Sequence, residues 1–73
     1  MTFGEKAVGL SFNPSQDSRV DEMKRAYAGV IDALHNLREH LPRSETARLA
    51  SIAITEAQGV QMWAVKALTW KED

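Results

Sequence analysis

The sequence predicts an all-α protein in which a short N-terminal segment precedes a long antiparallel hairpin of two helices. Two stretches, residues 18–41 and 44–70, carry apolar side chains at helical spacing, and Pro42 lies between them. Ten of the 73 residues are alanine, which is the strongest helix former. A chain of this length supplies one domain, so we assign residues 1–73 to a single helical-hairpin domain.

The N-terminal segment, residues 1–17, is expected to contain no long helix. Three residues interrupt any regular period in it: Gly4, Gly9 and Pro14. Residues 5–10 have the composition for one helical turn. Asn13 precedes a proline and is therefore disfavoured in the helical region of backbone space. Asp17 or Ser18 is a suitable N-cap for the helix that follows.

The first long helix is predicted over residues 18–41. Seven of its apolar residues alternate at spacings of three and four, which is a heptad stripe: Val20, Met23, Tyr27, Val30, Leu34, Leu37 and Leu41. Ile31 widens this stripe. A second face carries small residues, Ala26, Gly29 and Ala33. A glycine inside a helix costs about 1 kcal/mol relative to alanine, so Gly29 is expected to have a packing reason. We therefore interpret the heptad stripe and the small-residue face as packing surfaces.

The second long helix is predicted over residues 44–70, with Ser44 as its N-cap and Glu45 in its first turn. Its polar residues form one narrow stripe: Arg48, Ser51, Thr55, Gln58, Lys66 and Thr69. Most of the remaining surface of this helix is apolar. One partner helix covers only about a third of a helix circumference, so an apolar surface of this width must be buried on more than one side. The chain has no third long helix, and the missing cover is therefore expected to come from other copies of the same chain.

Charge and composition exclude several classes of partner. Nine lysines and arginines against ten acidic residues give a net charge of −1, which does not favour duplex DNA or an anionic membrane surface. The chain has no apolar run of about 20 residues that would span a bilayer. It has no cysteine, and His35 and His40 alone do not make a metal site. We therefore expect no cofactor, and the cytoplasm is the expected compartment.

No arrangement of residues indicates catalysis. The run from Gly4 to Ser11 resembles a phosphate-binding loop only superficially, because its lysine lies between the glycines and no strand precedes it. No nucleophile, base and acid can be grouped from their spacing. The protein is therefore expected to bind a ligand or a partner and not to be an enzyme.

The candidate ligand-binding residues lie in the N-terminal loop and at the start of the first long helix: Phe12, Asn13, Pro14, Lys24 and Arg25. An aromatic ring near backbone N–H groups and a pair of cations suits a ligand that has flat rings and phosphates. The alternative is that Phe12 is a hydrophobic plug and that the two cations belong to a solvated face.

Three stretches of the chain carry a family resemblance. Residues 4–15 read Gly-Glu-Lys-Ala-Val-Gly-Leu-Ser-Phe-Asn-Pro-Ser, and Lys24 follows at the helix start. Residues 49–58 read Leu-x-x-Ile-Ala-Ile-Thr-x-x-Gln, and residues 62–70 read Met-Trp-Ala-Val-Lys-Ala-Leu-Thr-Trp. The chain resembles the phage-encoded anti-CBASS and anti-Thoeris sponge proteins, which share one hairpin domain, and within them it is most similar to the anti-CBASS sponge.

The resemblance implies a homohexamer of hairpins that binds cyclic nucleotide second messengers in the cytoplasm of the infected bacterium. Binding without cleavage would deprive immune effectors of their activator. Cyclic dinucleotides are implied to bind between paired protomers, and cyclic trinucleotides in separate pockets at three-fold junctions. Related members take a cyclised ADP-ribose signal instead. The alternative function is a non-catalytic, self-assembling helical adaptor or interaction protein.

The resemblance also implies roles for individual residues. Phe12 corresponds to a loop aromatic that stacks on a base, and it stands where other members have tyrosine. Asn13 and Pro14 match the loop that follows this aromatic. Lys24, or the adjacent Arg25, matches the cation near the phosphates. The trinucleotide pocket uses an arginine, for which two residues near the helix turn are candidates, Arg43 and Arg48.

Overall fold

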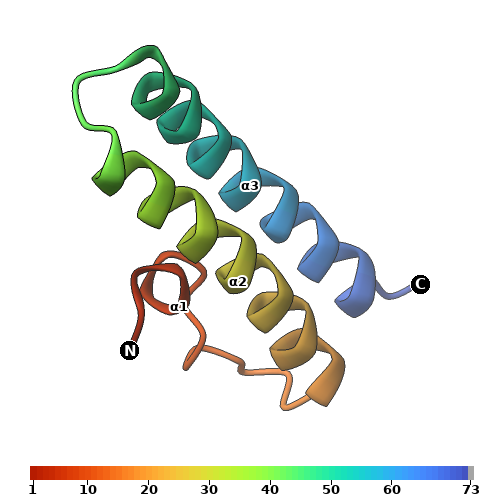
Figure 1. Cartoon of the computed structure of the whole chain (residues 1–73). Coiled ribbons are helices and arrows are strands. Elements are labelled where there is room, and N and C mark those ends of the chain that lie inside the picture. Colours follow the sequence, from red (N-terminus) through yellow and green to blue (C-terminus); the bar gives the residue numbers. More distant parts are fainter. Residues whose placement is uncertain (73) are drawn as a thin grey trace.

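The computed structural model describes residues 1–72 and has three helices in this range, α1 (Phe3–Ala7), α2 (Ser18–His40) and α3 (Glu45–Thr69). Figure 1 shows α2 and α3 lying side by side and antiparallel, with the N-terminal segment against α2. The molecule is elongated, with principal extents of 48 × 23 × 13 Å. The predicted all-α hairpin is confirmed, and both long helices end within one residue of their predicted bounds.

Short polar side chains cap the helix starts. Ser44 is the N-cap of α3, as predicted, and its hydroxyl accepts a hydrogen bond from Ala47 N at 3.1 Å. Thr2 caps α1 through a reciprocal pair of hydrogen bonds with Glu5, which was not predicted. The short α1 therefore starts before the turn that was expected over residues 5–10.

Asp17 is the N-cap of α2, which selects it from the two predicted candidates. Its carboxylate accepts a hydrogen bond from the Arg19 backbone N at 2.9 Å and pairs with the Arg19 guanidinium at 2.7 Å. The hydrogen bonds from Arg19 hold the pKa of the Asp17 carboxyl below its usual range. The contribution of this cap to stability is therefore present above the pKa of the unfolded chain, and it is lost as the pH falls through the folded value.

The turn between α2 and α3 lies where the sequence predicts it. Leu41 caps the C-terminus of α2, and its N–H donates to Leu37 O at 3.3 Å. Pro42 has no N–H to continue the helix. Arg43 then adopts a positive φ of 61°, which reverses the chain toward α3.

The core lies where the N-terminal segment, α2 and α3 meet. Ile31 is the most buried side chain, and it clusters with Val8, Ala28 and Ile54. Val8 comes from the N-terminal segment, Ile31 from α2 and Ile54 from α3, so the core needs all three parts of the chain. The N-terminal segment is thus part of the folded unit and covers one side of the seam between the long helices.

The predicted heptad stripe is only in part the face that α2 buries within one chain. Of its seven residues Val20 is buried, whereas Val30, Leu37 and Leu41 are exposed. The other buried residues of α2 are Lys24, Ala28 and Ile31, of which Ile31 was predicted to widen the stripe. The absence of a side chain on Gly4 lets α1 approach the backbone of Ala28 closely, whereas heptad spacing does not say from which side the neighbours come. The predicted small-residue face is also exposed, and a Cβ built on Gly29 meets no atom within 4 Å.

The apolar surface of α3 is only partly covered by the rest of the chain. Its exposed large apolar residues are Leu49, Ile52, Val60, Met62 and Trp63, and Trp70 follows as its C-cap. Trp63 is 71% exposed, which is unusual for so large an apolar side chain. In residues 1–72 no helix combines the length and the apolar character that crossing a membrane requires.

Candidate functional site

A close contact between α1 and α2 positions the loop that carries the candidate ligand residues. Gly4 N donates to Asp32 Oδ1 at 2.6 Å. A Cβ on Gly4 would lie 2.1 Å from the backbone oxygen of Ala28, so only glycine permits this approach. Phe3 stacks on His35 with ring centroids 4.2 Å apart and planes 6° apart. None of these contacts was predicted, because they join residues that are far apart in the sequence.

The chain after α1 folds back through a series of backbone hydrogen bonds. Leu10 N donates to Glu5 O at 3.0 Å, and Phe12 N donates to Gly9 O at 2.9 Å. Gly9 has a φ of +63°, a conformation that favours glycine. This turn directs the carbonyl oxygens of Gly9 and Phe12 toward α2.

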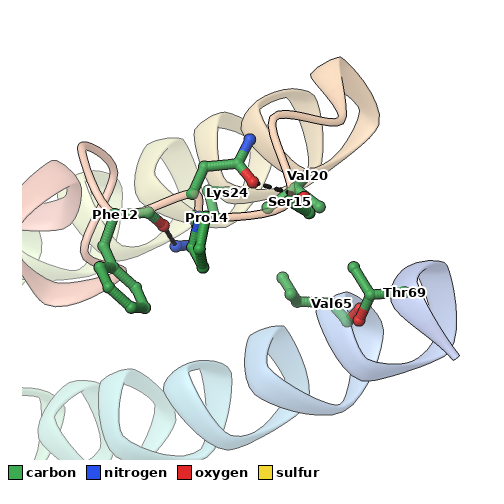
Figure 2. A pocket seen from close by; sticks show the side chains of 8 residues that line it. Phe12, Pro14, Ser15, Val20, Lys24, Val65 and Thr69 are labelled. Atoms are coloured by element: carbon green, nitrogen blue, oxygen red, sulfur yellow. Dashed lines mark hydrogen bonds between the residues drawn. The ribbon is translucent and has the colours of Figure 1, made fainter.

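Lys24 holds the turn against α2. Its side chain is buried, with 6% of the residue exposed. The ammonium Nζ donates to Gly9 O at 2.9 Å and also to Phe12 O, the second of which is drawn in Figure 2. An ammonium has three N–H donors, so one is left beyond these two bonds. Lys24 is therefore a structural tether for the loop as well as a cation beside Phe12.

Asn13 also stabilises the loop. Its side-chain nitrogen Nδ2 donates to Asp17 O at 3.0 Å and to Asp21 Oδ1 at 3.1 Å, which uses both amide hydrogens. Its side-chain oxygen Oδ1 accepts from Ser15 Oγ at 2.6 Å. The sequence predicts Asn13 as part of the candidate ligand loop, and the structure shows that its amide joins that loop to the start of α2.

Phe12 is the exposed member of the loop. The residue is 70% exposed, so the alternative that it plugs the core does not hold within one chain. Lys24 Nζ lies 5.7 Å from the ring centroid, within range of a cation–π interaction. The ring therefore offers a free aromatic face next to a positive charge.

Two cavities lie beside the Phe12 ring. One has a volume of about 250 Å³ and lies between the loop and the end of α3 (Figure 2); its lining includes Phe12, Pro14, Ser15, Lys24, Val65 and Thr69. The other has a volume of about 450 Å³ and is lined by the turn after α1 and by α3. Phe12, Lys24 and Val65 line both. The two cavities therefore form one groove between the N-terminal segment and α3.

The remaining predicted residues lie outside this groove. Arg25 is exposed and lines neither cavity, because consecutive helical residues point about 100° apart. Arg43 and Arg48 lie at the α2–α3 turn, at the opposite end of the hairpin from the loop of residues 9–17 (Figure 1). Arg48 is paired with Glu45 through Nε and Oε1 at 2.7 Å. One chain brings Phe12, Asn13, Pro14 and Lys24 together and leaves the three arginines elsewhere.

The groove is suited to binding through stacking and charge. Most of its lining is apolar or aromatic, and Lys24 supplies a cation next to the ring. Across residues 1–72, no three side chains among His, Asp and Glu come together as metal ligands would. The residues of the groove thus fit a flat, anionic organic ligand.

Comparison with known proteins identifies the family. A model of the Acb2/Tad1 hairpin domain matches residues 5–69, which include α2, α3 and the ligand loop. Searches of curated proteins and of solved structures gave no significant match. The match covers nearly all of the chain, and it agrees with the helical hairpin seen in the structure. This protein therefore belongs to the Acb2/Tad1 hairpin-domain family of anti-CBASS and anti-Thoeris sponges.

Proposed function

We propose that this protein binds cyclic oligonucleotide second messengers and sequesters them without cleavage, so that host immune effectors in the infected bacterium are not activated. Cyclic dinucleotides are the favoured ligands, with cyclic trinucleotides or cyclic ADP-ribose signals as alternatives. The family membership supports this class of ligand. The single structural observation that carries the proposal is the exposed Phe12 ring over the groove, next to the Lys24 ammonium.

Each part of the proposed ligand has a matching group in the groove. A nucleobase stacks on the Phe12 ring, a contact that contributes about 1–3 kcal/mol for each base. A phosphate takes the remaining N–H of Lys24, whose charge also favours the anion. Asn13 holds the loop in the shape that presents the ring, and Pro14 lies beside the ring in the lining of the groove. Arg25, Arg43 and Arg48 would meet ligand only if another copy of the chain brought them to its groove.

The test of this function follows the ligand through binding and release. Purified protein is mixed with a cyclic dinucleotide, the mixture is filtered, and the retained protein is heated. Retention followed by release of intact nucleotide supports sequestration. Nucleotide that passes the filter unbound contradicts it and favours the adaptor function, and nucleotide that is chemically altered indicates an enzyme.

Replacing Phe12 with alanine is expected to weaken binding of the cyclic dinucleotide at least about tenfold, since the stack accounts for about 1–3 kcal/mol. Titration calorimetry measures this change. Phe12→Tyr is the matched control and should bind almost as the wild type does, because it keeps the ring. Both variants should retain the helical content, since Phe12 is mostly exposed. Wild-type affinity in Phe12→Ala would remove Phe12 from the site.

We further propose that the chain assembles into a homo-oligomer, with six copies favoured by the family resemblance. The exposed apolar residues of α3 support this, since leaving each large one in water costs about 1.5–3 kcal/mol relative to burial. Trp63→Glu should shift the mass measured by light scattering toward the monomer, because it places a charge in the apolar surface. Thr55→Glu, on the polar stripe of the same helix, should leave the mass unchanged. A folded wild-type monomer at micromolar concentration would contradict assembly.

A further inference from the structure

Gln61 is a buried polar residue of α3 for which the fold alone gives no reason. Only 4% of it is exposed, yet its amide makes no hydrogen bond within residues 1–72. No fully buried side-chain nitrogen or oxygen in that range lacks a partner. The small exposed area of Gln61 must therefore lie at its amide atoms. An amide that is so enclosed and has no partner in the protein is free to pair with what lies in the opening in front of it, which is water or a ligand.

The opening in front of Gln61 is the larger cavity of the groove. This cavity, of about 450 Å³, is also lined by Phe12 and Lys24. Its polar side chains are Gln61 and the two lysines Lys6 and Lys24, and its lining includes no carboxylate. A base that stacks on Phe12 in this cavity would therefore have its edge near the one side chain that offers both a donor and an acceptor.

We propose that Gln61 reads the edge of the base that stacks on Phe12, and that it selects adenine. This inference rests on the proposed function. The glutamine amide places one N–H donor beside one C=O acceptor, which matches the acceptor N7 and the donor N6–H₂ of adenine in two parallel hydrogen bonds. In this proposal the stack on Phe12 and the phosphate at Lys24 fix which edge the base presents, and the corresponding edge of guanine carries two acceptors, N7 and O6, that cannot satisfy both amide groups. Gln61 is thus a specificity-determining residue, while stacking and charge supply affinity for any base.

Base preference tests this role because a merely structural residue would not change it. Titration calorimetry with cyclic di-AMP and cyclic di-GMP gives the ratio of the two affinities. The wild type should prefer cyclic di-AMP. Gln61→Lys replaces the acceptor with donors, and it should lower the ratio at least about tenfold in favour of cyclic di-GMP, whose N7 and O6 both accept hydrogen bonds at this edge. The ratio cancels any general attraction between the new charge and the phosphates.

Two further variants make the result specific. Gln58→Lys changes a half-buried glutamine on the same helix that does not line this cavity, and its ratio should stay within about twofold of the wild type. Gln61→Met keeps the volume without the amide, and its preference for cyclic di-AMP should disappear. This variant provides the test if Gln61→Lys does not fold. A ratio unchanged in the Gln61 variants overturns this inference alone. A wild type that binds neither dinucleotide overturns the proposed function together with it.

Discussion

Replacing Lys24 with methionine is expected to detach the turn of residues 9–12 from α2 and to abolish binding of cyclic nucleotides. Methionine keeps an apolar stem but removes the ammonium that donates to Gly9 O and Phe12 O. Hydrogen bonds of charged groups contribute about 1.5–3 kcal/mol each, so the turn should lose about 3 kcal/mol of local stability. Amide hydrogen exchange at Phe12, whose N–H is bonded to Gly9 O, should accelerate about 100-fold.

Two matched variants separate the tether from a simple charge. Arg25→Met removes the adjacent exposed cation and should change stability by no more than about 0.5 kcal/mol. Lys24→Arg keeps the charge, but a planar guanidinium does not replace a compact ammonium between two carbonyls. It should therefore also loosen the turn and weaken binding. Wild-type exchange at Phe12 in Lys24→Met would show that Lys24 does not hold the loop.

Replacing Gly4 with alanine is expected to displace α1 from α2. The added Cβ would lie 2.1 Å from the backbone oxygen of Ala28, which has no free rotation to give way. Undocking α1 breaks the hydrogen bond from Gly4 N to Asp32 and exposes Val8, which is buried in the core. Burial of a valine-sized side chain contributes about 1.5–3 kcal/mol, so the melting temperature should fall by about 10 °C.

Gly29→Ala is the control for the Gly4 variant. Gly29 lies inside α2, and a Cβ there meets no atom within 4 Å. Alanine is favoured over glycine in a helix by about 1 kcal/mol, so this variant should be as stable as the wild type or more so. Thermal unfolding followed by circular dichroism compares the two. A Gly4→Ala protein that melts with the wild type would show that α1 does not depend on the close contact.

Gly4→Ala should also reduce ligand binding, although Gly4 lies outside the groove. The turn after α1 carries Gly9 and Phe12, so a displaced α1 no longer directs these residues toward Lys24. Phe12→Ala, by contrast, should weaken binding without lowering stability. The two variants therefore distinguish Phe12, which is proposed to contact the ligand, from Gly4, which positions the turn that carries Phe12.

Much of the candidate site could be predicted from the sequence, but the roles within it could not. Phe12 and Pro14 stood out as an aromatic and a turn residue in a short loop, and they line the groove. Lys24 and Asn13 were predicted as ligand-binding residues from their chemistry and from the family resemblance. The structure shows that the side chains of both make hydrogen bonds that hold the loop in place. Gln61 gave no signal, because an isolated glutamine in a helix is usually exposed.

The sequence by itself determined the two long helices, the turn between them and the cap at Ser44, and it narrowed the other cap to Asp17 or Ser18. These features depend on residues within a few positions of one another, since spacing, capping hydrogen bonds and a proline act locally. Only the tertiary structure decided which face of α2 is buried and where the N-terminal segment docks. Those outcomes depend on the close approach of Gly4 to Ala28 and on the bonds from Lys24 to the loop, contacts between residues at least 12 positions apart whose formation no local pattern encodes.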